Sequence, residues 1–233
     1  MNASYVSPRA KISDSAYIGD GVKIYGPAKV SENCVIEDNV AIGKPDRDSI
    51  ESLRDEQNVD IEHYDAAVTR ETTIGANTVL RTGSEVYEGC ELGESVGTEN
   101  YVRIGWDSSI GSQSRIMYRG LIYVNVSVGR DTWVGGFVSN NTQIGNDCSF
   151  FGSAIHEFPP EVEDPEEDNP EHLPAPQIKS GSIVGFGAQL IGGIDVGEGS
   201  YVGSNAVITK DVPADYMAIN CNELRPKENM GSR

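Results

Sequence analysis

Residues 178–213 read IKSGSI-VGFGAQ-LIGGID-VGEGSY-VGSNAV-ITKDVP, which is six consecutive units of six residues. Each of these hexads begins with a branched aliphatic residue. The fifth places hold small or aliphatic residues, namely Ser182, Ala188, Ile194, Ser200, Ala206 and Val212. A period of six fits neither a free helix nor a hairpin strand. It is typical of a solenoid in which every sixth residue reaches a shared interior.

The same period covers much of the remaining chain. It runs without a break from Val6 to Ile42 and again from Ile74 to Val134, where Thr98 is the one off-pattern member. A phase slip follows, after which the aliphatic or aromatic places are Val138, Ile144 and Phe150. Three hexads, each a short strand and a corner, make one triangular coil of about 18 residues. The sequence therefore predicts an all-β fold, a parallel β-helix of about nine coils.

We expect a single domain over residues 1–233 that is interrupted by two excursions. The coils are expected at about 6–47, 74–155 and 178–213, with an excursion at 44–73, a loop at 156–177 and a C-terminal tail at 214–233. The first excursion is polar, highly charged and partly compatible with helix, so it should pack outside the prism. The loop holds eight carboxylates, six prolines and no Lys or Arg, which should keep it extended and out of the core.

Charge and hydropathy exclude several classes of partner. The net charge of −18 argues against nucleic acid or an anionic membrane as partner, and it is compatible with a high-salt cytoplasm. The charge is uneven, because residues 178–233 carry five Lys or Arg against six Asp or Glu, which is −1, and the remainder carries −17. No apolar run approaches the length of a membrane span, and the N-terminus lacks the apolar stretch of a signal peptide. We therefore expect a cytoplasmic protein.

The cysteines are expected to be structural. Cys34, Cys90 and Cys148 occupy the inward fifth place of their hexads, and Cys221 lies in the tail. We interpret them as small hydrophobic residues instead of disulfides, metal ligands or nucleophiles.

The C-terminal part of the pattern has a known counterpart. The chain reads IGNDCSFFGSAIHEF, then the proline-rich loop, then APQIKSGSIVGFGAQLIGGIDVGEGSYVGSNAVITKDVP and ADYMAIN. This order resembles the hexapeptide-repeat acyltransferases, in particular the galactoside, maltose and xenobiotic acetyltransferases and the sugar-nucleotide acetyltransferases. The resemblance implies a left-handed β-helix, although general crossover chirality would favour a right-handed path. It also implies acetyl-coenzyme A as co-substrate and a homotrimer with active sites between subunits.

His156, which opens the loop, is the candidate catalytic residue. The resemblance assigns it the role of general base, and the chemistry requires the same residue type. Acetyl transfer from a thioester to a hydroxyl or amine needs a base that titrates near neutrality, and the ordinary pKa of imidazole is near 6.5. The alternative is a histidine that merely caps the end of a coil. The other two histidines, His63 and His172, are expected to be solvated.

Further site residues follow from the resemblance by position. The candidates for coenzyme A binding are Gly185, Phe186, Gly203, Ser204, Thr209, Lys210 and Arg225. Ile183 stands where many relatives carry a tryptophan, which weakens any inference about aromatic stacking on the cofactor. The side chains near the loop that could select a sugar or nucleotide-sugar acceptor are Asn140, Asn141 and Glu157. No metal ion is expected.

Other functions remain open at this point. The first hypothesis is an acetyl-coenzyme A-dependent O- or N-acetyltransferase that acts on a sugar, a nucleotide sugar or a similar small acceptor. A non-catalytic scaffold or regulatory subunit would suit the charged excursion but leaves the histidine at the loop unexplained. A γ-class carbonic anhydrase needs three zinc-binding histidines on neighbouring coils, and two of the three histidines here lie in the interrupting segments. Transfer from an acyl carrier protein is a variant of the first hypothesis.

Overall fold

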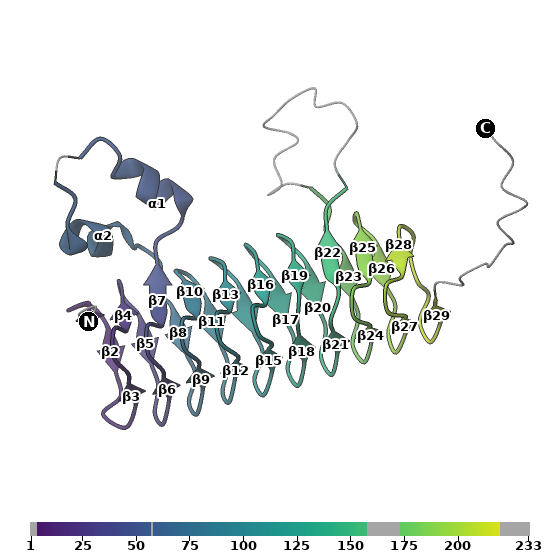
Figure 1. The fold of residues 1–233 in the computed structure, drawn as a ribbon, viewed down its shortest axis with the longest axis horizontal. Coiled ribbons are helices and arrows are strands. Elements are labelled where there is room, and N and C mark those ends of the chain that lie inside the picture. The colour runs from purple at the N-terminus through teal and green to yellow at the C-terminus, as the bar shows by residue number, and fades with distance from the viewer. Residues whose placement is uncertain (1–3, 57, 158–172, 220–233) are drawn as a thin grey trace, which may run out of the picture.

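The computed structural model describes residues 4–56, 58–157 and 173–219, which form a triangular prism of stacked coils (Figure 1). Three parallel sheets form its faces, with ten, nine and ten strands. Each strand pairs with the strand one coil further along, so that Tyr5 lies opposite Lys23 and Val6 opposite Ile24. This is the left-handed parallel β-helix that the hexads and the resemblance predict.

The strands are two to four residues long, and up to β28 every third strand belongs to the same face. The first face consists of β1 (Tyr5–Val6), β4 (Lys23–Ile24), β7 (Ala41–Lys44), β10 (Glu85–Tyr87), β13 (Arg103–Ile104), β16 (Leu121–Ile122), β19 (Phe137–Val138), β22 (Ser153–Ile155), β25 (Gln189–Ile191) and β28 (Val207–Ile208). The second face consists of β2 (Lys11–Ile12), β5 (Lys29–Val30), β8 (Thr73–Ile74), β11 (Glu91–Leu92), β14 (Ser109–Ile110), β17 (Ser127–Val128), β20 (Gln143–Ile144), β23 (Gln177–Ile178) and β26 (Asp195–Val196). The third face consists of β3 (Tyr17–Ile18), β6 (Val35–Ile36), β9 (Val79–Leu80), β12 (Gly97–Thr98), β15 (Arg115–Ile116), β18 (Trp133–Val134), β21 (Ser149–Phe150), β24 (Ile183–Val184), β27 (Tyr201–Val202) and β29 (Met217–Ala218).

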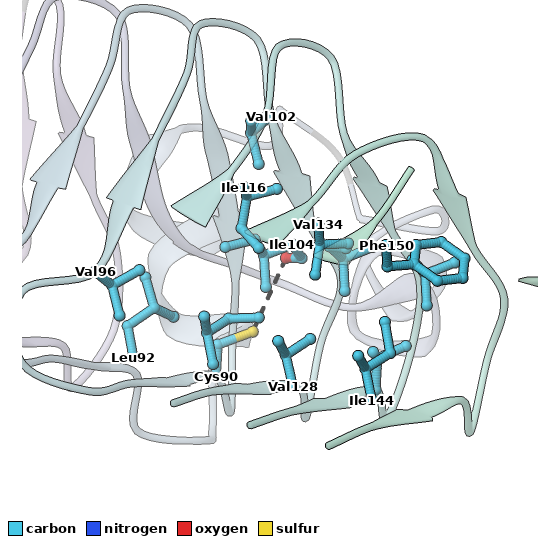
Figure 2. Packing of buried hydrophobic residues seen from close by; sticks show 14 of the residues in the cluster. Cys90, Leu92, Val96, Val102, Ile104, Ile116, Val128, Val134, Ile144 and Phe150 are labelled. Atoms are coloured by element: carbon cyan, nitrogen blue, oxygen red, sulfur yellow. Dashed lines mark hydrogen bonds between the residues drawn. The ribbon is translucent and has the colours of Figure 1, made fainter. Parts of the chain in front are cut away.

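The core is a single aliphatic column inside the prism, as the hexads predict. Ile104 and Ile116 are fully buried, and Phe150 is the largest of the fully buried side chains (Figure 2). Cys90 lies in this column, where burial raises its pKa to about 12. Cys34 and Cys148 are also buried, and all three are free thiols, as expected for small hydrophobic residues that face inward. Cys221 lies outside the described residues.

The prism has ten levels, one more than the nine coils expected. The additional strand positions are β22, β29 and an isolated parallel bridge between Val196 and Val212, which extends the second face. The corner between β18 and β19 and the corner between β21 and β22 are each shorter than the others. The first of these explains the phase slip after Val134. Gly136 makes the tight path possible, because it adopts φ +100° and an added Cβ would collide with the carbonyl oxygen of Gly152.

Both excursions leave the same edge of the prism. The first connects β7 to β8 and the second connects β22 to β23, so both depart between the first and second faces, which we call the excursion edge (Figure 1). The first excursion contains α1 (Arg47–Ser52) and α2 (Ile61–Ala67), which confirms that this segment is partly helical. Neither of these helices, the two in the described part of the chain, has the length and hydropathy of a membrane span.

Candidate functional site

His156 lies at the excursion edge, directly after β22, where the second excursion begins. Its Nδ1 atom is 3.1 Å from the carbonyl oxygen of Pro174, on the segment that returns to the prism. Because a carbonyl oxygen can only accept, Nδ1 is the donor nitrogen, and in the neutral ring Nε2 is then the acceptor nitrogen. The Nε2 atom is buried and has no hydrogen-bond partner within the described part of the structure. This arrangement is that of a base whose acceptor nitrogen is free to take a proton.

A cavity of about 460 Å³ adjoins His156. It is lined by Ile155 and His156 from one coil, by Arg47 from the first excursion, and by Arg103, Trp106, Tyr123, Val124, Phe137, Ser139 and Asn140 from the three preceding coils. A second cavity of about 380 Å³ shares Arg47, Trp106, Val124 and Asn140 with it and extends towards Asp46 and Arg70. Together they form a groove along the excursion edge, which we call the edge groove. Its size suits a sugar-sized ligand.

The structure places the three predicted acceptor residues differently. Asn140 lines both cavities, although its Oδ1 accepts a hydrogen bond from the backbone N–H of Val124 at 3.1 Å. Asn141 lines only the second cavity, and its Oδ1 accepts from Asn125 at 2.8 Å. Glu157 is exposed and lines neither cavity. Of the three, Asn140 is thus the residue that shares a cavity with His156.

The predicted coenzyme A residues divide between two edges of the prism. Thr209 and Lys210 follow β28 on the excursion edge, two coils beyond His156. The other described candidates lie between the third and first faces, which we call the return edge, and are Gly185, Phe186, Gly203 and Ser204. Arg225 lies outside the described residues. Within one prism, the width of the first face therefore separates the two groups.

Phe186 is the most distinctive of these candidates. Its side chain is 69% exposed, and its ring stacks on Phe151 with a centroid distance of 4.6 Å and an interplanar angle of 11°. Such a pair presents a flat apolar surface at the return edge.

The sequence reasoning missed most of the residues that line the groove. Arg103 and Phe137 occupy the outward place just before a buried aliphatic residue, and Trp106 and Tyr123 follow such residues at the corner. The 18-residue coil period is the signal that could have found them, since it places these positions on the same edge as His156. Arg47 lies in the first excursion, where no period applies.

Glu88 fixes both ends of the first excursion. This side chain is fully buried, and its Oε1 accepts a hydrogen bond from the backbone N–H of Asp46 at 2.9 Å. Its Oε2 accepts from the backbone N–H groups of Thr69 and Arg70, each at 3.0 Å. A single carboxylate thus ties the departing and returning segments of the excursion to the prism, which positions Arg47 over the groove.

Arg70 adds a cluster of charges at the far end of the groove. Its guanidinium pairs with Asp46, with Asp107 at 2.6 Å and with Glu88 at 3.6 Å. Burial raises the pKa of Asp107 above its ordinary value, which Arg70 opposes and the carboxylates of Glu88 and Asp46 reinforce. These carboxylates are therefore already engaged with a cation.

Metal coordination has no support in the described ranges. No group of three or more His, Cys, Asp or Glu side chains there is arranged to hold a metal ion. His63 is exposed and lies 2.7 Å from Asp60 through its Nδ1, in the N-terminal cap of α2, and His172 lies outside the described residues.

Comparisons with known proteins agree with the fold and with the hexads. The chain is 26% identical over 228 residues to the bifunctional protein GlmU of Shouchella clausii, covering 97% of this chain and 41% of that protein. It is 25% identical over 219 residues to GlmU of Thermodesulfovibrio yellowstonii, covering 93% of this chain and 40% of the relative. The resemblance to the hexapeptide-repeat acyltransferases is confirmed. The chain spans about two-fifths of the length of these curated relatives.

No family model matches the chain. Among solved structures, the UDP-N-acetylglucosamine acyltransferase from Campylobacter jejuni matches with a TM-score of 0.40 and 14% identity, over 91% of this chain and 69% of that one.

Proposed function

We propose that the chain is an acyltransferase that moves an acetyl group from acetyl-coenzyme A to a hydroxyl or amino group of a sugar or nucleotide sugar. The observation that carries this proposal is the state of His156. Its Nδ1–H is held by the Pro174 carbonyl, and its buried Nε2 has no partner among the described residues and borders a cavity of about 460 Å³. The similarity to acyltransferases of the same fold supports it.

The proposed reaction is a direct transfer in a ternary complex. Nε2 of His156 takes the proton of the acceptor as the acceptor oxygen or nitrogen bonds to the thioester carbonyl carbon. The C–S bond then breaks, and the imidazolium returns the proton to the departing thiolate of coenzyme A. A backbone N–H would stabilise the oxyanion between these steps. A cysteinyl intermediate is not expected, because the three described cysteines are buried and burial raises the pKa of each thiol.

The acceptor can be found by a screen. Purified protein would be incubated with acetyl-coenzyme A and a panel of free sugars, sugar phosphates and nucleotide sugars, and free thiol would be measured. The proposal predicts thiol release that depends on one class of acceptor, together with an acetylated product in the mass spectrum. Thiol release that no acceptor accelerates would contradict it.

Lys210 tests the proposed place of the cofactor. Its side chain is exposed on the excursion edge, about 10 Å beyond His156 at two sheet spacings. Lys210→Glu should raise the KM for acetyl-coenzyme A more than it lowers kcat, because a phosphate contact is lost and repulsion is added. Lys179→Glu is the matched control, since Lys179 is exposed on the second face and pairs with Asp195 at 3.2 Å. Calorimetry would measure coenzyme A affinity, and an unchanged affinity in Lys210→Glu would place the nucleotide elsewhere.

We also propose that the protein assembles as a cyclic trimer. The last coils of the third face carry an outward column of paired positions, Ile183, Tyr201 and Met217, which are 44%, 37% and 65% exposed. Ser149 separates this column from Trp133, which is 47% exposed. An apolar column of this kind favours contact with another subunit. A neighbouring prism would also supply the second wall that the divided coenzyme A residues require.

The trimer should depend on salt. The loop at 156–177 brings eight carboxylates per chain, so we expect assembly to weaken at low ionic strength, where repulsion is poorly screened. Light scattering combined with activity measurements over a salt series would show this. A fully active monomer at every salt concentration would contradict a site shared between subunits.

A further inference from the structure

A cavity of about 590 Å³ lies away from His156, between the first excursion and the N-terminal coils. Its floor is the first face, where Lys23, Ala41 and Glu85 occupy consecutive outward places of β4, β7 and β10. Its roof is α2 and the residues just before that helix. Because β7 and β22 are five coils apart on the first face, this cavity lies about 24 Å along the prism from the coil of His156. We call it the α2 cavity.

The floor of the α2 cavity is hollow because Ala41 is small. Its neighbours in the same outward column, Lys23 and Glu85, carry long side chains and lie on either side of it. The roof contributes Val59 and Ile61, which are 45% and 40% exposed although both border the cavity. These apolar side chains leave part of their surface to solvent. An apolar ligand body above Ala41 would remove that surface from water.

Two tyrosines border the α2 cavity, one from the prism and one from α2. The rings of Tyr25 and Tyr64 pack on each other with a centroid distance of 4.9 Å. Burial raises the pKa of both phenols, so both hydroxyls keep their protons at neutral pH. Neither hydroxyl has a hydrogen-bond partner among the described residues. Each can therefore donate a hydrogen bond to a ligand that accepts one.

Lys23 carries the one unpaired charge among the described residues that line the α2 cavity. Lys44 pairs with Glu85 at 2.7 Å, and Asp60 accepts hydrogen bonds from two backbone N–H groups in the first turn of α2. The Lys23 ammonium forms no ion pair or hydrogen bond with any described residue. One ammonium group matches a ligand with a single negative charge. A doubly charged phosphate would instead be repelled by the carboxylates of Glu85 and Asp60.

We propose that the α2 cavity binds a small monocarboxylate with an apolar body. The Lys23 ammonium pairs with the carboxylate, and the apolar body lies over Ala41 against Val59 and Ile61. The α2 cavity and the edge groove share none of their described lining residues, so this inference does not depend on acetyl transfer. Because the ligand would contact both the coils and α2, it would hold the first excursion against the prism.

Calorimetry with four matched probes would test the class of ligand. The probes are phenylbutyrate, its neutral amide, butyrate and phenylpropyl phosphate. We expect phenylbutyrate to bind about tenfold more tightly than each of the others. The amide lacks the charge, butyrate lacks most of the apolar surface, and the phosphate brings a second charge. Equal binding of phenylbutyrate and its amide, or no binding of phenylbutyrate, would overturn the inference.

Three variants would assign the binding to this cavity. Lys23→Met should weaken phenylbutyrate binding about tenfold and leave binding of the amide unchanged. Ala41→Leu fills the hollow and should weaken both of these probes. Lys11→Met is the matched control, because Lys11 is exposed on the second face and does not line the cavity, and it should bind like the wild type. Thermal unfolding of each variant would establish that it folds.

Amide hydrogen exchange would locate the bound probe. Phenylbutyrate should slow exchange at residues 58–68 in the wild-type protein, because it ties α2 to the coils. The same concentration should give much less protection in Lys23→Met. Binding that Lys23→Met leaves unchanged, or protection confined to segments outside the α2 cavity, would overturn the inference.

Discussion

His156→Ala is expected to lower turnover by roughly two to four orders of magnitude, which is the usual contribution of a general base. The free energy of unfolding should barely change, because His156 is half-buried at the start of a loop, and its hydrogen bond among the described residues is to the Pro174 carbonyl. Steady-state kinetics with the acceptor found by the screen would measure the loss.

Two variants control this experiment. His63→Ala removes the other described histidine, which is exposed on α2, and should leave turnover unchanged. His156→Gln retains a donor for the Pro174 carbonyl but cannot take a proton at neutral pH, so it should be as slow as His156→Ala. Turnover close to that of the wild type in either His156 variant would show that another group is the base.

Glu88→Ala should have the largest effect on stability. The carboxylate is fully buried and accepts three backbone hydrogen bonds, and Arg70 lies 3.6 Å from it. Its removal leaves these donors without an acceptor beneath the excursion, at a cost on the order of 3 kcal/mol. Amide hydrogen exchange should speed up first at residues 44–73, because the coils keep their own backbone hydrogen bonds from strand to strand.

The control for Glu88 is a variant of an exposed carboxylate. Glu71 pairs with Lys29 at 2.7 Å, and both side chains are more than two-fifths exposed, so Glu71→Ala should cost little. Glu88→Ala should also lower acetyl transfer to the acceptor, since Arg47 would lose its fixed place over the groove. Unchanged exchange at residues 44–73 in Glu88→Ala would contradict the role of this residue as an anchor.

The sequence predicted the interior of the prism well, because every sixth residue must fill the same narrow column. The aliphatic residues that begin the hexads from Ile178 to Val202 are buried as expected, and Ile208, which begins the last hexad, is partly buried near the end of the stack. Two of the three additional strand positions, β22 and the bridge at Val212, follow corners shorter than a full hexad, whereas β29 follows Val212 at the full period. A fixed period cannot detect such corners, whereas the glycines in them, such as Gly136, are a signal.

The site was harder to predict than the fold. His156 was identified because it opens a loop at a recognisable place in the repeats. The opposite wall of its cavity comes from outward positions such as Arg103, which the period leaves free to vary, and from Arg47 in a segment without any period. That segment is placed over the groove by hydrogen bonds to Glu88, and long-range contacts of this kind leave no local pattern in the sequence.

The most direct test of the central claim follows the acetyl group itself. Acetyl-coenzyme A labelled with carbon-13 in the acetyl group would be incubated with the protein and its acceptor, and products would be identified by mass spectrometry. We predict that the label appears on the acceptor in proportion to the thiol released, and that His156→Ala abolishes nearly all of this transfer. Label found only in free acetate or on the protein, or transfer that does not depend on His156, would contradict the account.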